Sequence, residues 1–361
     1  MRRLLWKWHG LAGLIAALPL FVIALTGSLL VFKAELDGLL MPEVVNASAG
    51  PRLPMNQLVA SANQQLSGSE ILGWQFGQTG EADTLFVAAM GTYDWQKVWL
   101  DPASGSLLTP PVSLTWAITD WLLDLHYMLL LEHAGLLIAG VMALLFLFLG
   151  ISGIVLHRQF WRTFFTLRWH KGLRLLLSDA HKMLGIVGAP VFLVLGFTGA
   201  WWNLEHFYEE ELSGHDDSQY IISQSYYSPA LDFDALLADT RRQLPTFVPT
   251  YLRLPDASYP GVHFFGYRED GGVLRSRFGS IVSYNDQSGA HTSTLDVAGA
   301  PALYQFTDSF RPLHYGDFGG LTTRILWCII GFFPCLMALS GFWMWRQRSG
   351  RKAPRRTPVT A

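Results

Sequence analysis

Cysteine is nearly absent from this chain. The 361 residues include only Cys328 and Cys335, seven positions apart in an apolar run. On a helix, that spacing separates them by about 10 Å along the axis, too far for a disulfide. The sequence has no CxxC pair for zinc, too few thiols for an iron–sulfur cluster and no CxxCH for covalent haem. Cysteine usage therefore says little about the redox compartment.

A nucleotide fingerprint and an excess of positive charge are also missing. No GxGxxG follows a predicted strand. The formal net charge is only −2, which does not suggest nucleic acid as a partner. Half of the residues are hydrophobic, with 23 Phe and 14 Trp, and only 15% are charged. This composition is typical of a membrane protein.

Four uncharged runs are long enough to cross a hydrocarbon core of about 30 Å. They cover Leu11–Phe32, Ala134–Leu156, Met183–Leu204 and Ile325–Trp345. Of the 26 basic residues, 15 lie in the segment before the first run, the loop after the second and the tail after the fourth. Positive charge is enriched on the cytoplasmic side, so the sequence predicts a multi-pass protein of the bacterial inner membrane with both termini cytoplasmic.

The first run has one alternative interpretation. Met1–Leu25 has the charged start and apolar body of a signal peptide, and Ala47-Ser48-Ala49 resembles a cleavage site. The apolar stretch is too long for a signal peptide, however, and the cleavage-like site lies well beyond its end. We therefore expect the first run to be a transmembrane helix.

The chain repeats two spacings between a histidine and a hydroxyl residue, which indicates an internal duplication. The spacings are 17 residues, from His9 to Thr26 and from His181 to Thr198, and 26 residues, from His126 to Ser152 and from His314 to Ser340. The predicted fold is an all-α four-helix transmembrane bundle made of two parallel repeats, whose axis lies along the membrane normal.

Each repeat also contains a periplasmic segment that reads as an α+β module. In the first, a helix over Met55–Leu66 precedes strand-like runs and the turn at 101–105; in the second, a helix near Phe233–Gln243 precedes similar runs and the turn at 285–289. The predicted order is helix 1–33, module 34–133, helix 134–157, cytoplasmic basic loop 158–182, helix 183–204, module 205–320, helix 321–346 and basic cytoplasmic tail 347–361.

Histidines are the main chemical feature. His9 and His181 begin the two outward spans, and His126 and His314 precede the two return spans. Ionisable groups at membrane depth are functional candidates. Two facing imidazoles without Cys, Asp or Glu suit axial ligation of haem iron better than zinc, which needs three or four ligands. The sequence therefore predicts two haem b groups, one on His9 and His181 and one on His126 and His314.

Other histidines also lie at span ends and rank second as ligands. They are His133, His157 and His206, and the repeat positions of the first two hold Leu321 and Trp345. The duplication therefore does not support them. For His170, His215, His263 and His291 we expect ordinary loop or surface roles.

Several motifs resemble one family. They are Trp8-His9-Gly10-Leu11, Asp179-Ala180-His181-Lys182, the 313–320 segment Leu-His-Tyr-Gly-Asp-Phe-Gly-Gly and the turns at 101–105 and 285–289. Together they resemble the PepSY-associated transmembrane (PepSY_TM) family of iron-regulated inner-membrane proteins, over nearly the whole chain, and the outer modules resemble PepSY domains. The four first-ranked histidines match the family's recurrent histidines.

The resemblance implies a di-haem ferric-siderophore reductase, an oxidoreductase that passes electrons from the cytoplasmic side to the periplasm. The cytoplasmic loops are too short for a flavin domain, so we expect a separate donor, which is a reduced flavin, a flavoprotein or a quinol. Adding one electron to Fe(III) yields Fe(II), which hard oxygen ligands hold less well, so reduction releases iron for uptake. Arg311, Trp121 and Tyr315 are candidates for contact with a periplasmic ferric siderophore. One alternative is a siderophore or haem permease without redox activity, but the spans lack the midplane Asp, Glu, Lys or Arg of a substrate site. The other is a regulatory or peptidase-inhibiting protein, which leaves the four paired histidines unexplained.

Overall fold

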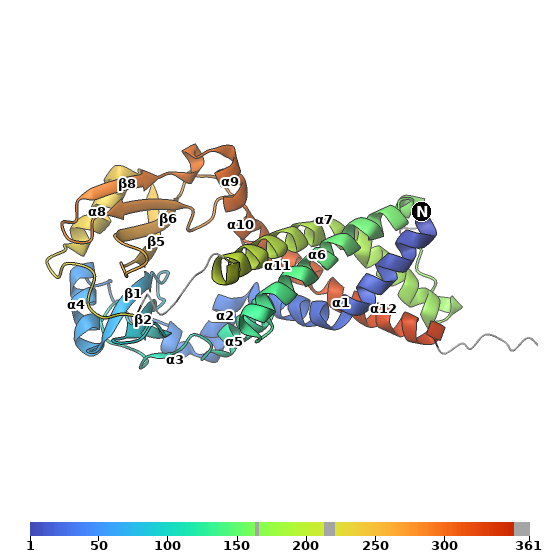
Figure 1. The fold of residues 1–361 in the computed structure, drawn as a ribbon, viewed down its shortest axis with the longest axis horizontal. Helices are drawn as coiled ribbons and strands as arrows, with labels where there is room; N and C mark the ends of the chain where they lie inside the picture. The colour runs from blue at the N-terminus through green and yellow to red at the C-terminus, as the bar shows by residue number, and fades with distance from the viewer. Residues whose placement is uncertain (163–165, 213–220, 350–361) are drawn as a thin grey trace, which may run out of the picture. The chain divides into compact units, whose positions relative to one another are not determined.

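The protein is described by a computed structural model, in which residues 1–162, 166–212 and 221–349 are placed (Figure 1). The chain divides into two compact units. The helical unit contains residues 1–31, 123–210 and 324–361, and the sheet unit contains residues 32–122 and 211–323. Most of the predicted tail, 347–361, and His215 lie outside the described residues.

The helical unit contains the four predicted spans. They are α1 (Arg2–Leu30), α6 (Glu132–Leu156), α7 (Leu173–Phe207) and the pair α11 (Gly320–Gly331) and α12 (Phe333–Ser349). By length and composition, four helices in the described part of the chain can cross a membrane. The helix α1 packs against α6 and α12, and α7 packs against the same two helices. The helices α1 and α7 therefore lie diagonally opposite each other in the bundle.

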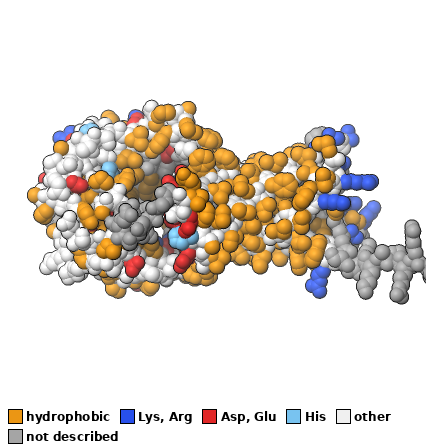
Figure 2. Space-filling model, in the orientation of Figure 1, with side chains coloured by type: hydrophobic (Ala, Val, Ile, Leu, Met, Phe, Trp, Pro, Cys, Tyr) orange, Lys and Arg blue, Asp and Glu red, His pale blue; other side chains and the backbone are white. Residues whose placement is uncertain are grey.

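The outer surface of the helical unit is mostly hydrophobic, and Lys and Arg gather at the end where the chain begins (Figure 2). Such a surface is expected of transmembrane helices, because the side chains that face the hydrocarbon core of a bilayer are mostly apolar. Two features differ from the sequence prediction. The helix α7 begins at Leu173, so part of the predicted loop 158–182 is helical. The fourth span is broken at Phe332, where Pro334 has no N–H to donate in the next turn.

Short elements connect the spans to the sheet unit. The positive φ angles of Leu129, Leu130 and Glu132 turn the chain sharply between α5 and α6. The remaining short elements are α2 (Lys33–Leu40), α3 (Pro42–Val45), α5 (Ile118–Met128), α9 (Ala302–Asp308), α10 (Phe310–Tyr315), the 3-10 turn η5 (Val297–Gly299) and the π-helical turn η3 (Tyr208–Leu212). The 3-10 turns η1 (Phe160–Arg162) and η2 (Trp169–Lys171) lie between α6 and α7, within the helical unit.

The sheet unit contains one antiparallel sheet of eight strands in the order β4-β3-β2-β1-β5-β6-β7-β8. The strands are β1 (Ser69–Gln75), β2 (Asp83–Ala89), β3 (Trp95–Leu100), β4 (Val112–Ser113), β5 (Phe247–Arg253), β6 (Val262–Arg268), β7 (Ser280–Tyr284) and β8 (His291–Leu295). The sequence predicts two modules, and the structure joins their strands edge to edge through β1 and β5.

Glycine makes this β1–β5 junction possible. Gly73 pairs with Arg253, and a Cβ at Gly73 would lie 1.9 Å from Oη of Tyr251. Any larger residue would therefore displace the tyrosine from the junction. The two predicted amphipathic helices, α4 (Met55–Gln65) and α8 (Phe233–Gln243), bury their apolar sides against the sheet. The core includes the fully buried rings of Trp74 and Phe264.

Candidate functional site

The imidazole of His9 lies inside the helical unit, between α1 and α6. Its Nδ1 is 2.7 Å from Oγ of Ser152, which is only 2% exposed. The serine hydroxyl donates its single proton to the carbonyl of Leu149 at 3.3 Å. The serine oxygen then accepts the proton of Nδ1, and this network assigns the tautomer. The lone pair of Nε2 is left for another partner.

The imidazole of His181 makes the matching arrangement between α7 and α12. Its Nδ1 is 3.2 Å from Oγ of Ser340, and this hydroxyl donates to the carbonyl of Met337 at 3.2 Å. A Cβ built at Gly153 would lie 3.7 Å from Cε1 of His9, and one at Gly341 would lie 3.7 Å from Cε1 of His181. A serine and a glycine therefore lie beside each ring. The two rings come from the diagonal helices α1 and α7.

The imidazole of His126, on α5, packs against α1 near its other end. Its Nδ1 donates to the carbonyl of Ile23 at 2.9 Å and lies 3.3 Å from Oγ1 of Thr26. Gly27 provides the space, because a Cβ there would be 2.5 Å from Cε1 of the ring. Ile23 and Gly27 are 14 and 18 residues beyond His9, which corresponds to about 21–27 Å of helix rise.

The donor set of these three histidines fits axial ligation of haem. A metal-ligating histidine usually donates its second N–H to a carbonyl or other acceptor, which orients the ring and fixes the tautomer. All three rings meet this condition through Nδ1. Within the described residues, no group of three or more His, Cys, Asp or Glu side chains is arranged to hold a metal ion. A haem iron, which brings four porphyrin nitrogens, would need only two such histidines.

The fourth first-ranked histidine, His314, belongs to the sheet unit, on α10. Its ring centroid is 6.2 Å from that of Tyr315. His126 belongs to the helical unit, so the pairing of His126 with His314 stays a prediction. The candidate substrate residues are also in the sheet unit. The guanidinium of Arg311 lies over the rings of Phe278 and Tyr315, and Trp121 is an exposed residue of α5.

The second-ranked histidines have different surroundings. His133 and His206 are 54% and 53% exposed, and both contact the carboxylate of Glu210 at 2.9 Å. Burial, with the nearby carboxylates of Asp124 and Glu210, raises the pKa of Tyr127 to about 12. The surroundings of His133 and His206 are therefore polar and contain carboxylates.

The third second-ranked histidine, His157, caps the end of α6. Burial and the positive charges of Lys182 and Arg2 lower its pKa.

Ser152 and Ser340 are the functional candidates that the ligand predictions omit. The sequence contains a signal for them, since both occur at repeat-equivalent positions next to a glycine. The spacing relates them to His126 and His314, whereas the structure places them against His9 and His181. Glu210 was also omitted, and no repeated pattern marks it.

Two comparisons with known proteins bear on this site. A Pseudomonas aeruginosa protein described as uncharacterized is 27% identical over 255 residues, which are 63% of this chain and 63% of the relative. The chain thus matches less than two thirds of that protein's length. The family described as PepSY-associated TM region (PepSY_TM) matches residues 6–348, a range that contains all four first-ranked histidines. This chain therefore belongs to the PepSY_TM family of membrane proteins.

Proposed function

We propose that this protein is a di-haem b-type reductase of the inner membrane, which passes electrons from the cytoplasmic side to a periplasmic ferric siderophore. One observation carries the proposal. Three partly buried imidazoles, those of His9, His181 and His126, each donate from Nδ1 to an oxygen of the protein. Histidines that only anchor a helix at the membrane interface do not require this shared orientation.

The matched hydrogen bonds also support the proposed pair of parallel repeats. His9 and Ser152 are 143 residues apart, and His181 and Ser340 are 159 residues apart. Each pair joins the first and second spans of one repeat. Two equivalent histidines on diagonal helices have their rings inside the same bundle, as the pairing of His9 with His181 requires.

The residues divide into two sets along α1. His9 and His181 would hold one haem near the basic end, and His126 with His314 would hold the second. Bound haem would supply one-electron carriage across the membrane. The serines and the carbonyl of Ile23 hold the rings and their tautomers, while Gly27, Gly153 and Gly341 leave room beside them.

The sheet unit offers residues suited to an anionic or apolar siderophore. The guanidinium of Arg311 lies 4.4 Å from the ring centroid of Phe278 and 5.1 Å from that of Tyr315. Among the described residues, Arg311 has no carboxylate partner, so its positive charge is available to a ligand. The exposed rings of Tyr315 and Trp121 can cover apolar parts of such a ligand.

A direct experiment tests the proposal. The purified chain is reduced with dithionite, the excess is removed, and a ferric hydroxamate is added with a ferrous-iron chelator. We expect the haem spectrum to return to the oxidised form while the chelator captures an equivalent amount of Fe(II). A variant with His126→Ala should lose this reaction, and His291→Ala, at an exposed position on β8, should retain it. A protein without haem, or haem that several siderophore classes leave reduced, would favour a permease or a regulator.

A further inference from the structure

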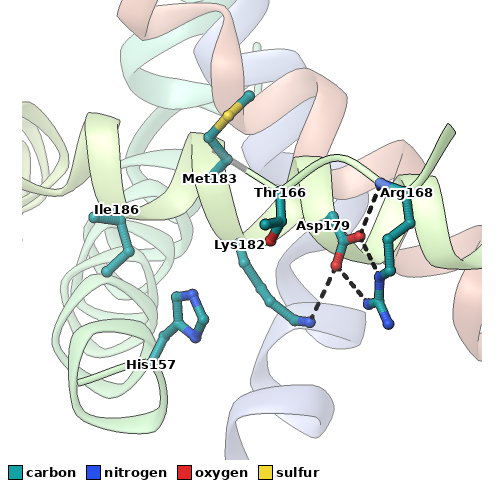
Figure 3. Close-up of a pocket in the computed structure, with 7 residues that line it drawn as sticks. All are labelled: His157, Thr166, Arg168, Asp179, Lys182, Met183 and Ile186. Carbon is teal, nitrogen blue, oxygen red and sulfur yellow. Dashed lines mark hydrogen bonds and ion pairs between the residues drawn. The ribbon is translucent and has the colours of Figure 1, made fainter. Parts of the chain in front are cut away.

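A pocket of about 370 Å³ lies in the helical unit between the end of α6 and the first turns of α7 (Figure 3). Its volume is within the range of small-molecule sites. One wall is a single face of α7, and the others come from the end of α6 and the segment before α7. The lining residues are His157, Thr166, Arg168, Asp179, Lys182, Met183 and Ile186.

Positive charge exceeds negative charge in this pocket. The carboxylate of Asp179 is engaged by Arg168, whose Nη2 and Nε donate at 2.7 and 2.8 Å. Lys182 is 44% exposed, and its Nζ is 3.6 Å from the same carboxylate, so its charge is only weakly paired. His157 adds a second nitrogen donor on the facing wall. These groups suit an anionic, phosphate-like part of a ligand.

The rest of the pocket suits a flat apolar ring. Met183 and Ile186 follow one another on the same face of α7, one helical turn apart. Lys182 and Met183 also follow His181 directly in the chain, so the pocket begins within one turn of a proposed haem ligand. A ligand bound here would sit beside the place where electrons must enter.

We propose that this pocket binds the electron donor, a free reduced flavin mononucleotide, with its phosphate at Lys182 and its ring against Met183 and Ile186. This inference rests on the proposed reductase function. Oxidation of one reduced flavin releases two electrons and two protons. The electrons reduce two ferric siderophores to the Fe(II) state, and the protons pass to water. A quinol carries no anionic group and would leave the cationic side of the pocket unused.

Binding of oxidised flavin mononucleotide to the detergent-solubilised full chain tests the proposal without any turnover. Quenching of flavin fluorescence reports the affinity. We expect Lys182→Gln to weaken binding about tenfold or more, because a charge-assisted hydrogen bond to phosphate is lost. Riboflavin, which lacks the phosphate, should bind the wild type and Lys182→Gln equally. Lys171→Gln, an exposed position in η2 outside the pocket, is the matched control.

A second variant separates the ring from the phosphate. Ile186→Trp should fill the pocket and weaken flavin mononucleotide and riboflavin alike. Haem content and oxidation by a ferric siderophore after dithionite reduction are measured on every variant. Two results would overturn the donor site and leave the proposed function intact. In both, the wild type passes those two assays, but it either binds no flavin mononucleotide or binds it with the same affinity as the Lys182→Gln variant. Loss of both assays in the wild type overturns the function itself.

Discussion

Replacing Ser152 by alanine should weaken the haem proposed to lie at His9. The hydroxyl of Ser152 accepts from Nδ1 of His9 at 2.7 Å and is only 2% exposed, so water cannot easily replace it. A buried donor left without a partner costs about 1–3 kcal/mol. Loss of an outer-shell partner typically lowers metal affinity about 10–100-fold. At 1.4 kcal/mol per factor of ten, this range corresponds to about 1.4–2.8 kcal/mol, so the two estimates agree.

The assay is transfer of haem from the purified chain to an excess of apomyoglobin, followed by its absorption spectrum. We expect Ser152→Ala to release one haem about 10–100-fold more readily than the wild type. Ser340→Ala should have a smaller effect, because its hydrogen bond to His181 is longer, at 3.2 Å.

The control is Ser28→Ala, since Ser28 is equally buried in α1 but donates only to the carbonyl of Ala24. If Ser152→Ala and Ser28→Ala retain haem equally, Nδ1 of His9 does not orient a ligand and the assignment fails.

Three further predictions follow from the packing. Gly27→Ala places a Cβ 2.5 Å from Cε1 of His126, so a pyridine haemochrome assay should find one haem lost; two retained haems would contradict the role of this ring. Asp83→Ala removes a fully buried carboxylate that accepts from the indole N–H of Trp74 at 2.6 Å, so denaturant unfolding followed by fluorescence should show a loss of about 3–5 kcal/mol. A loss below about 1 kcal/mol would refute that estimate. His133→Ala should keep both haems, because that side chain is exposed and contacts a carboxylate. Loss of one haem in this variant would identify His133 as a ligand.

Local pattern was sufficient to predict several elements. The four spans follow from apolar length alone, since a bilayer sets the number of residues needed to cross it. The helix over Phe233–Gln243 begins and ends as predicted, because Asp232 caps it and its apolar residues recur on one face. The strands β4 and β8 were missed. The first has only two residues, and the second is almost fully exposed at the sheet edge and lacks an apolar pattern.

The sequence by itself determined where the chain crosses the membrane and which histidines repeat. Their positions depend on residues that are neighbours along one helix, and this information is local. Only the tertiary structure decided that Ser152 bonds to His9, although the repeated spacing relates it to His126. It also decided that two predicted modules form one sheet through β1 and β5. Contacts between distant segments depend on how helices and strand edges pack, and no periodic pattern in one segment encodes its partner.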